Sequence, residues 1–137
     1  MSTENAVHDK LGLPKILGLG FVFLWFFIGG IAHFVFTDLE MKIVPPWLPE
    51  HRLLVLVTGV FELIGAIGAL YLPTRSAAGW GLILLTAAVT PANIYMLQHV
   101  AQFPTVPYWA LIIRIPLQLA LLICIWWSTQ LPRKKTR

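Results

Sequence analysis

The stretch YWALIIRIPLQLALLICIWWS, residues 108–128, is almost wholly apolar and contains a single charged side chain, Arg114. A helix of roughly 20 apolar residues spans the hydrocarbon layer of a bilayer. Three further runs have this length and character, so the sequence predicts four transmembrane helices, at residues 14–36, 53–72, 77–98 and 108–128. Helices are favoured over strands because these runs lack the alternation of barrel strands, and lipid cannot satisfy open backbone groups.

The composition supports a membrane protein. Hydrophobic residues make up 58% of the chain and charged residues 12%, about half the charge of an average soluble domain. Basic residues gather near the chain ends, which indicates membrane topology rather than nucleic acid as a partner. We therefore predict one all-α, polytopic membrane domain over residues 1–137. Because several connections are short, its four helices should form an antiparallel bundle.

The basic residues also predict an orientation. Four spans place both termini on one side, together with most of the basic residues outside the membrane. Because basic residues favour the cytoplasmic side, we expect both termini in the cytoplasm and the chain in the plasma membrane. The basic residues on the terminal side are Lys10, Lys15, Arg75, Arg133, Lys134, Lys135 and Arg137, against Lys42 and Arg52 on the other.

The longest connection, TDLEMKIVPPWLPEH at residues 37–51, contains three prolines that prevent a continuous helix. We expect a stiff loop on the outer surface, with Trp47 at the membrane. The connection PTRSA at residues 73–77 is predicted to be a short loop.

Five polar side chains lie inside the predicted spans at similar depth. At a rise of about 1.5 Å per residue, each lies within roughly 15 Å of the outer end of its span. Arg114 and Gln118 are four residues apart and share one helix face. Polar and ionisable residues in membrane helices mostly face the bundle interior and mark functional sites. We therefore predict a ligand-binding pocket in the outer half of the bilayer, lined by His33, Glu62, Asn93, Arg114 and Gln118.

Charge predicts a pairing within this group. A charged side chain at mid-membrane costs at least about 2.5–3.5 kcal/mol, and arginine cannot lose its proton. Glu62 is the one acid inside the predicted spans, so we expect an Arg114–Glu62 ion pair. Its remaining hydrogen bonds are expected from Gln118, Asn93 and Thr58. Two alternatives stay open: Glu62 is protonated, or the polar groups serve only as contacts between helices.

Five segments, in order, resemble the DoxX-like family of small membrane proteins. They are GIAHF (30–34), VPPWLP (44–49), TGVFELIGAIGAL (58–70), PANIYM (91–96) and RIPLQ (114–118). The resemblance implies a bacterial, four-helix integral membrane protein of the cell inner membrane. It also implies a link to quinone-coupled oxidation or to membrane oxidoreductase complexes. The family's recurrent polar positions match His33, Glu62, Asn93, Arg114 and Gln118.

Two functional hypotheses follow. In the first, the protein is a redox- or quinone-associated accessory protein that binds a small amphipathic molecule, with Trp25, Phe61 and Tyr95 as apolar walls. In the second, it is a structural or assembly subunit of a larger membrane oxidoreductase complex, with no ligand chemistry of its own. No catalytic triad, P-loop or dinucleotide fingerprint is present, so whether the chain is an enzyme stays open. A quinone is the cofactor that the first hypothesis names, and a haem held by His33 and His99 is a weaker alternative. No metal site is predicted, because the histidines lack a ligand spacing.

Overall fold

The computed structural model describes residues 11–130, and they are almost entirely helical. The four long stretches that can cross a membrane are Leu13–Val35, His51–Leu70, Leu72–Gln98 and Tyr108–Thr129. This confirms the all-helical fold with four helical spans, which is the architecture of a multi-pass membrane protein. In order, the elements are α1 (Leu13–Val35), α2 (Thr37–Met41), α3 (His51–Leu70), α4 (Leu72–Ala88), α5 (Thr90–Gln98), the 3₁₀ helix η2 (Val100–Gln102) and α6 (Tyr108–Thr129).

Two connections differ from the prediction. Helix α4 begins at Leu72, so the expected loop at residues 73–77 is helical. Pro73 lies in the first turn, where proline is tolerated because its missing N–H would have no partner anyway. In the long connection, a short helix, α2, precedes the prolines. Thr37 stabilises the junction between α1 and α2, because its hydroxyl donates to the carbonyl of His33 at 2.7 Å, at the end of α1.

The third span is interrupted. Helix α4 ends at Ala88, Val89 lies between the two helices, and α5 begins at Thr90. Pro91 explains the break, because it has no N–H for the carbonyl one turn earlier and its ring disfavours a regular helix. Pro116 lies inside α6, and that helix continues through it.

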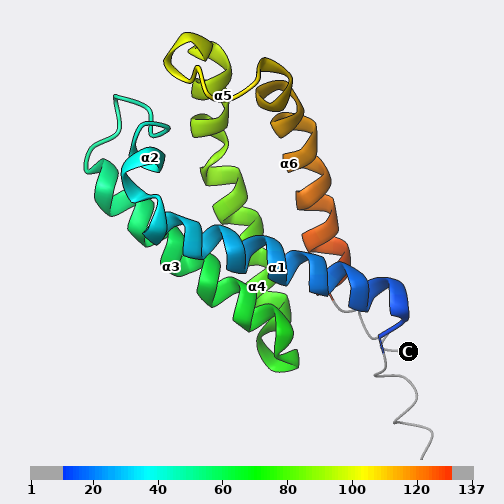
Figure 1. Ribbon diagram of the computed structural model, residues 1–137. Coiled ribbons are helices and arrows are strands. Elements are labelled where there is room, and N and C mark those ends of the chain that lie inside the picture. Colours follow the sequence, from blue (N-terminus) through cyan, green and yellow to red (C-terminus); the bar gives the residue numbers. More distant parts are fainter. Residues whose placement is uncertain (1–10, 131–137) are drawn as a thin grey trace, which may run out of the picture.

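The helices form an antiparallel bundle that is closed at one end and open at the other. Figure 1 shows α1 and α3 running side by side and diverging from α4, α5 and α6 towards the end where α2 and α5 lie. The starts of α1 and α4 and the ends of α3 and α6 gather at the closed end. A core from all four spans fills that half; it consists of Val22, Phe26, Ala66, Leu82, Leu121 and Ile125.

Small residues allow the close contacts at the closed end. A Cβ on Gly18 would lie 3.2 Å from Ser128 Cβ, and one on Gly65 would overlap a methyl carbon of Leu82. These contacts join α1 to α6 and α3 to α4. At the open end a separate apolar cluster joins α5 to α6 and to the loop between them. The helices of the two halves therefore meet at one end only, and at the other end the loop after α2 bridges them, because Ile43 packs against this cluster and Trp47 contacts Tyr95.

Candidate functional site

A cavity of about 780 Å³ lies between the two diverging halves of the bundle. Its size falls in the range of about 300–1,000 Å³ that small-molecule sites occupy. Most of its wall is apolar, with side chains from α1, α3, α4, α5 and α6. The five polar residues selected from the sequence all line this one cavity: His33, Glu62, Asn93, Arg114 and Gln118.

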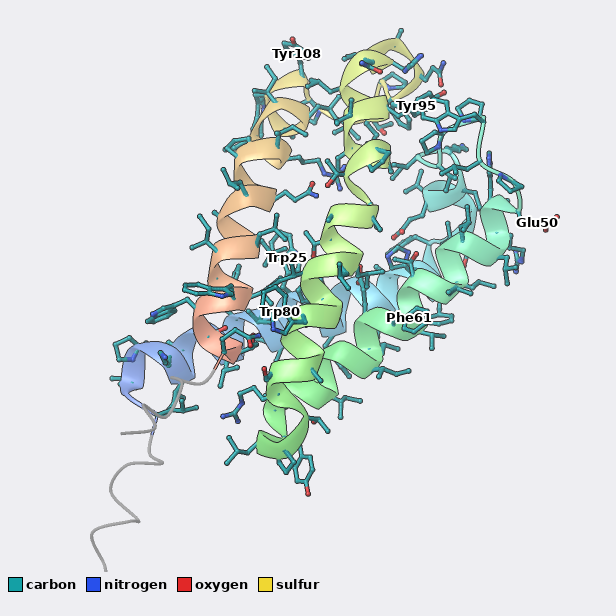
Figure 2. All side chains as sticks on the ribbon, turned by 180° about the vertical axis from the view of Figure 1, so that it is seen from behind. Trp25, Glu50, Phe61, Trp80, Tyr95 and Tyr108 are labelled. Atoms are coloured by element: carbon teal, nitrogen blue, oxygen red, sulfur yellow. The ribbon has the colours of Figure 1, made fainter. Side chains whose placement is uncertain are left out.

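The three aromatic residues expected in the wall behave differently. Trp25 lines the cavity, and in Figure 2 it is seen between α4 and α6. Phe61 is 56% exposed on α3 and is not part of the wall. Tyr95 is buried in the apolar cluster at the open end, against Phe103 and Trp47. The expectation was therefore wrong for Phe61 and Tyr95, because the face that each presents depends on how the helices are rotated.

Glycines bring the first polar wall together. A Cβ on Gly59 would lie 3.1 Å from the carbonyl oxygen of Gly30 and 2.7 Å from His33 Cβ. A Cβ on Gly29 would lie 2.7 Å from Glu62 Oε2. Only glycine at these positions lets α1 and α3 approach this closely. The contact places the His33 and Glu62 side chains next to each other.

His33 lies between two carboxylates. Its Nε2 is 3.4 Å from Glu62 Oε1, and its Nδ1 is 2.5 Å from Glu40 Oε2. The Glu40 contact does not have the angle of a hydrogen bond, and Nδ1 is buried. The side chains of Glu62, His33 and Glu40 are 13%, 15% and 23% exposed, so the group is largely enclosed. One imidazole here faces the acids of α2 and α3.

Glu40 was not selected from the sequence. It lies in α2, within the connection that was expected to be a loop. A signal was available, because Glu40 follows His33 by seven residues, which would place it on the same face if the first helix continued through Phe36. The prolines at residues 45, 46 and 49 obscured this signal. They exclude a helix at their own positions but do not exclude a short helix before them.

The second polar wall is centred on Gln118 of α6. Its Nε2 donates to the carbonyl oxygen of Thr86 at 2.7 Å and to the hydroxyl of Thr90. Its Oε1 accepts from Asn93 Nδ2 at 2.6 Å. These bonds tie α6 to the break between α4 and α5, where Pro91 disturbs the regular backbone bonds. Gln118 is therefore fully hydrogen-bonded within the protein.

Arg114 does not form the predicted ion pair. Its Nη1 donates to Met96 Sδ at 3.1 Å, and within residues 11–130 no carboxylate oxygen lies within 4.0 Å of its guanidinium. Glu62 lies against His33 instead. The reason is the divergence of the bundle, because α3 contacts α1, α2 and α4 but makes no extensive contact with α6. Arg114 therefore offers a cation to the cavity from the α6 wall.

Titratable side chains in the described part of the chain do not form a metal site, since no group of three or more His, Cys, Asp or Glu is arranged to hold an ion there. The arrangement is instead a mostly apolar cavity with an acid–imidazole–acid group on one wall and a guanidinium on another. Such a site can hold an amphipathic molecule and orient its polar atoms.

Comparison with known proteins identifies a family. The model of the family DUF8561, described as a domain of unknown function, matches residues 22–130. No curated protein and no solved structure matches the chain. The matched region includes all four spans, apart from the first turns of α1, and every polar residue of the cavity. The chain is thus a member of the DUF8561 family.

Proposed function

We propose that this protein binds a small amphipathic molecule of the quinone class in the cavity between the two halves of the bundle. The cavity itself is the main observation, because it brings the intramembrane polar residues to one mostly apolar space. A quinone has an apolar ring and tail and two carbonyl oxygens. Arg114 can donate to one carbonyl, while Trp25, Leu85 and Leu121 contact the ring.

The role we propose is that of a redox- or quinone-associated accessory protein in a bacterial inner membrane. The resemblance to DoxX-like proteins supports this role. Orientation with cytoplasmic termini rests on the distribution of basic residues. Of these, Lys15 and Arg75 lie at the closed end of the bundle, while Lys10 and the basic tail at residues 132–137 lie outside the described residues. With this orientation, the cavity occupies the outer half of the bilayer.

The alternative role is a structural subunit of a larger membrane complex. The Gln118 network supports it, because polar groups that bond one another act as contacts between helices. This role does not require a cavity next to that network, nor a guanidinium that has no acidic partner within residues 11–130. Ligand binding accounts for both, so we favour it.

Extraction of bound molecules tests the proposal. The full-length protein is purified in mild detergent, and its organic extract is analysed by mass spectrometry for quinones. Decylubiquinone is then titrated into the protein in lipid nanodiscs, with calorimetry as the readout. We expect either a co-purified quinone or saturable binding of decylubiquinone.

Two neighbouring alanines give matched variants. Ala88 lines the cavity, whereas its neighbour Ala87 is exposed on α4 outside it. Ala88→Phe should fill part of the cavity and abolish or strongly weaken binding, and Ala87→Phe should bind like wild type. A wild-type protein with no extracted quinone and no saturable binding would refute the proposal. Equal binding by the two variants would place the ligand elsewhere.

A further inference from the structure

Hydrogen-bond donors and acceptors are unevenly distributed over the cavity walls. The Gln118 network is the first example, because its bonds leave an acceptor unused. The carbonyl oxygen of Thr86 can only accept, so the Gln118 atom 2.7 Å away must be the amide nitrogen. Gln118 Oε1 then faces Asn93, and Asn93 must donate to it from Nδ2. This fixes the orientation of the second amide too. Asn93 Oδ1 is left as an acceptor without a hydrogen bond from the described residues.

The opposite wall has a larger excess of acceptors. Glu40 and Glu62 contribute four carboxylate oxygens, and the His33 ring between them offers at most two N–H donors. Hydroxyl groups nearby do not supply the difference. Thr58 Oγ1 donates to the carbonyl of Leu54 at 2.7 Å, and Thr86 Oγ1 donates to that of Leu82. Within residues 11–130, at least two carboxylate oxygens thus lack a donor.

Donors for a ligand come mainly from α6. The guanidinium of Arg114 has five N–H groups, and its one hydrogen bond in the structure goes to Met96 Sδ. A ligand in this cavity therefore meets a strong donor on one side and carboxylate acceptors on the other. The ligand therefore has to accept a hydrogen bond from Arg114 on one side and donate one to a carboxylate on the other.

We propose that the cavity selects the reduced, hydroquinone form of its ligand over the oxidised quinone. This inference rests on the proposed quinone site and specifies which form it holds. An oxidised quinone carries only acceptors and leaves at least two carboxylate oxygens of Glu62 and Glu40 without a donor in every orientation. In a hydroquinone, one hydroxyl donates to a carboxylate, and the oxygen of the other hydroxyl still accepts from Arg114.

The expected preference follows from the strength of one such contact. A hydrogen bond to a charged group changes an equilibrium constant by roughly tenfold to a hundredfold. We therefore expect decylubiquinol to bind at least about tenfold more tightly than decylubiquinone. By linkage, each factor of ten raises the midpoint potential of the bound couple by about 30 mV relative to the free couple.

The test compares the two forms under anaerobic conditions. Decylubiquinone and decylubiquinol are titrated separately into the full-length protein in nanodiscs, with calorimetry as the readout and empty nanodiscs as the blank. A redox titration of the bound couple gives the same ratio independently. Equal affinity, or tighter binding of the quinone, overturns the hydroquinone preference but leaves the proposed quinone site intact. Absence of binding by both forms overturns the site itself.

A pair of carboxylate-to-amide variants assigns the preference to one residue. Glu62→Gln replaces an acceptor oxygen with an N–H donor suited to a quinone carbonyl, so the affinity ratio should fall to about one or below. Glu50→Gln makes the same chemical change at an exposed position outside the cavity and should keep the wild-type ratio. An unchanged ratio in Glu62→Gln overturns the role of this carboxylate, and the wild-type comparison stands even if that variant fails to fold.

Discussion

The contact between α1 and α3 that holds the acid–imidazole group can be tested with one methyl group. In Gly59→Ala, the added Cβ would lie 2.7 Å from His33 Cβ and 3.1 Å from the carbonyl oxygen of Gly30. Favourable carbon–carbon contacts lie at about 3.5–4.0 Å, so α1 has to move away by about 1 Å at this point. Neither partner atom is the flexible end of a side chain, so a rotamer change cannot relieve the overlap.

The size of the effect follows from two opposing terms. Overpacking of a close contact costs about 1–3 kcal/mol, and replacing glycine by alanine in a helix returns up to about 1 kcal/mol. We expect Gly59→Ala to lower the free energy of unfolding by about 1–2 kcal/mol. It should also separate His33 from Glu62 and weaken ligand binding.

Gly20 on α1 supplies the control, because nothing lies within 4 Å of a Cβ added there. Gly20→Ala should leave stability unchanged or raise it by up to about 1 kcal/mol. Both variants are unfolded by titration with sodium dodecyl sulfate in mixed micelles and followed by circular dichroism. A Gly59→Ala protein as stable as Gly20→Ala would refute the close α1–α3 contact.

Three further predictions use the same unfolding assay. Gln118→Leu removes three hydrogen bonds and should cost about 2 kcal/mol at about 0.6 kcal/mol for each; a loss below a quarter of this would contradict the network. Arg75 is 8% exposed and donates from Nε and Nη2 to two carbonyls at the end of α3, at 2.9 and 3.0 Å. Arg75→Lys cannot keep this forked geometry, so its free energy of unfolding should fall by about 1–2 kcal/mol. An unchanged free energy of unfolding would show that the two hydrogen bonds do not contribute to stability. A double-mutant cycle between His33 and Glu62 should give a coupling of about 0.5–3 kcal/mol. The corresponding cycle between Arg114 and Glu62 should give about zero, and the reverse result would restore the ion pair expected from the sequence.

Much of the fold could be predicted because its determinants are local. The length and hydropathy of each span depend only on consecutive residues, and the boundaries of the first and fourth spans agree with the structure to within one residue. The start of the third span was misplaced, because Pro73 was taken to begin a loop and not a helix. Proline is compatible with both positions, and the sequence alone does not distinguish them.

The candidate site was predicted in part for a similar reason. Depth in the membrane follows from position along a helix, so the shared level of His33, Glu62, Asn93, Arg114 and Gln118 was readable before the structure, and all of them line one cavity. Which of them contact each other was not readable. Gln118 and Asn93 bond each other and not an Arg114–Glu62 pair, and Glu40 joins the group from outside the spans.

The sequence by itself determined four apolar helices and a common depth for their polar residues, since both depend on helix geometry and composition along the chain. The tertiary structure decided that these residues surround an open cavity and do not form one closed cluster. The physical reason lies in the contacts between helices. Glycines bring α1 against α3 and place His33 beside Glu62, while the bonds of Gln118 tie α6 to the break between α4 and α5. Glu62 therefore faces His33, and Arg114 faces the cavity.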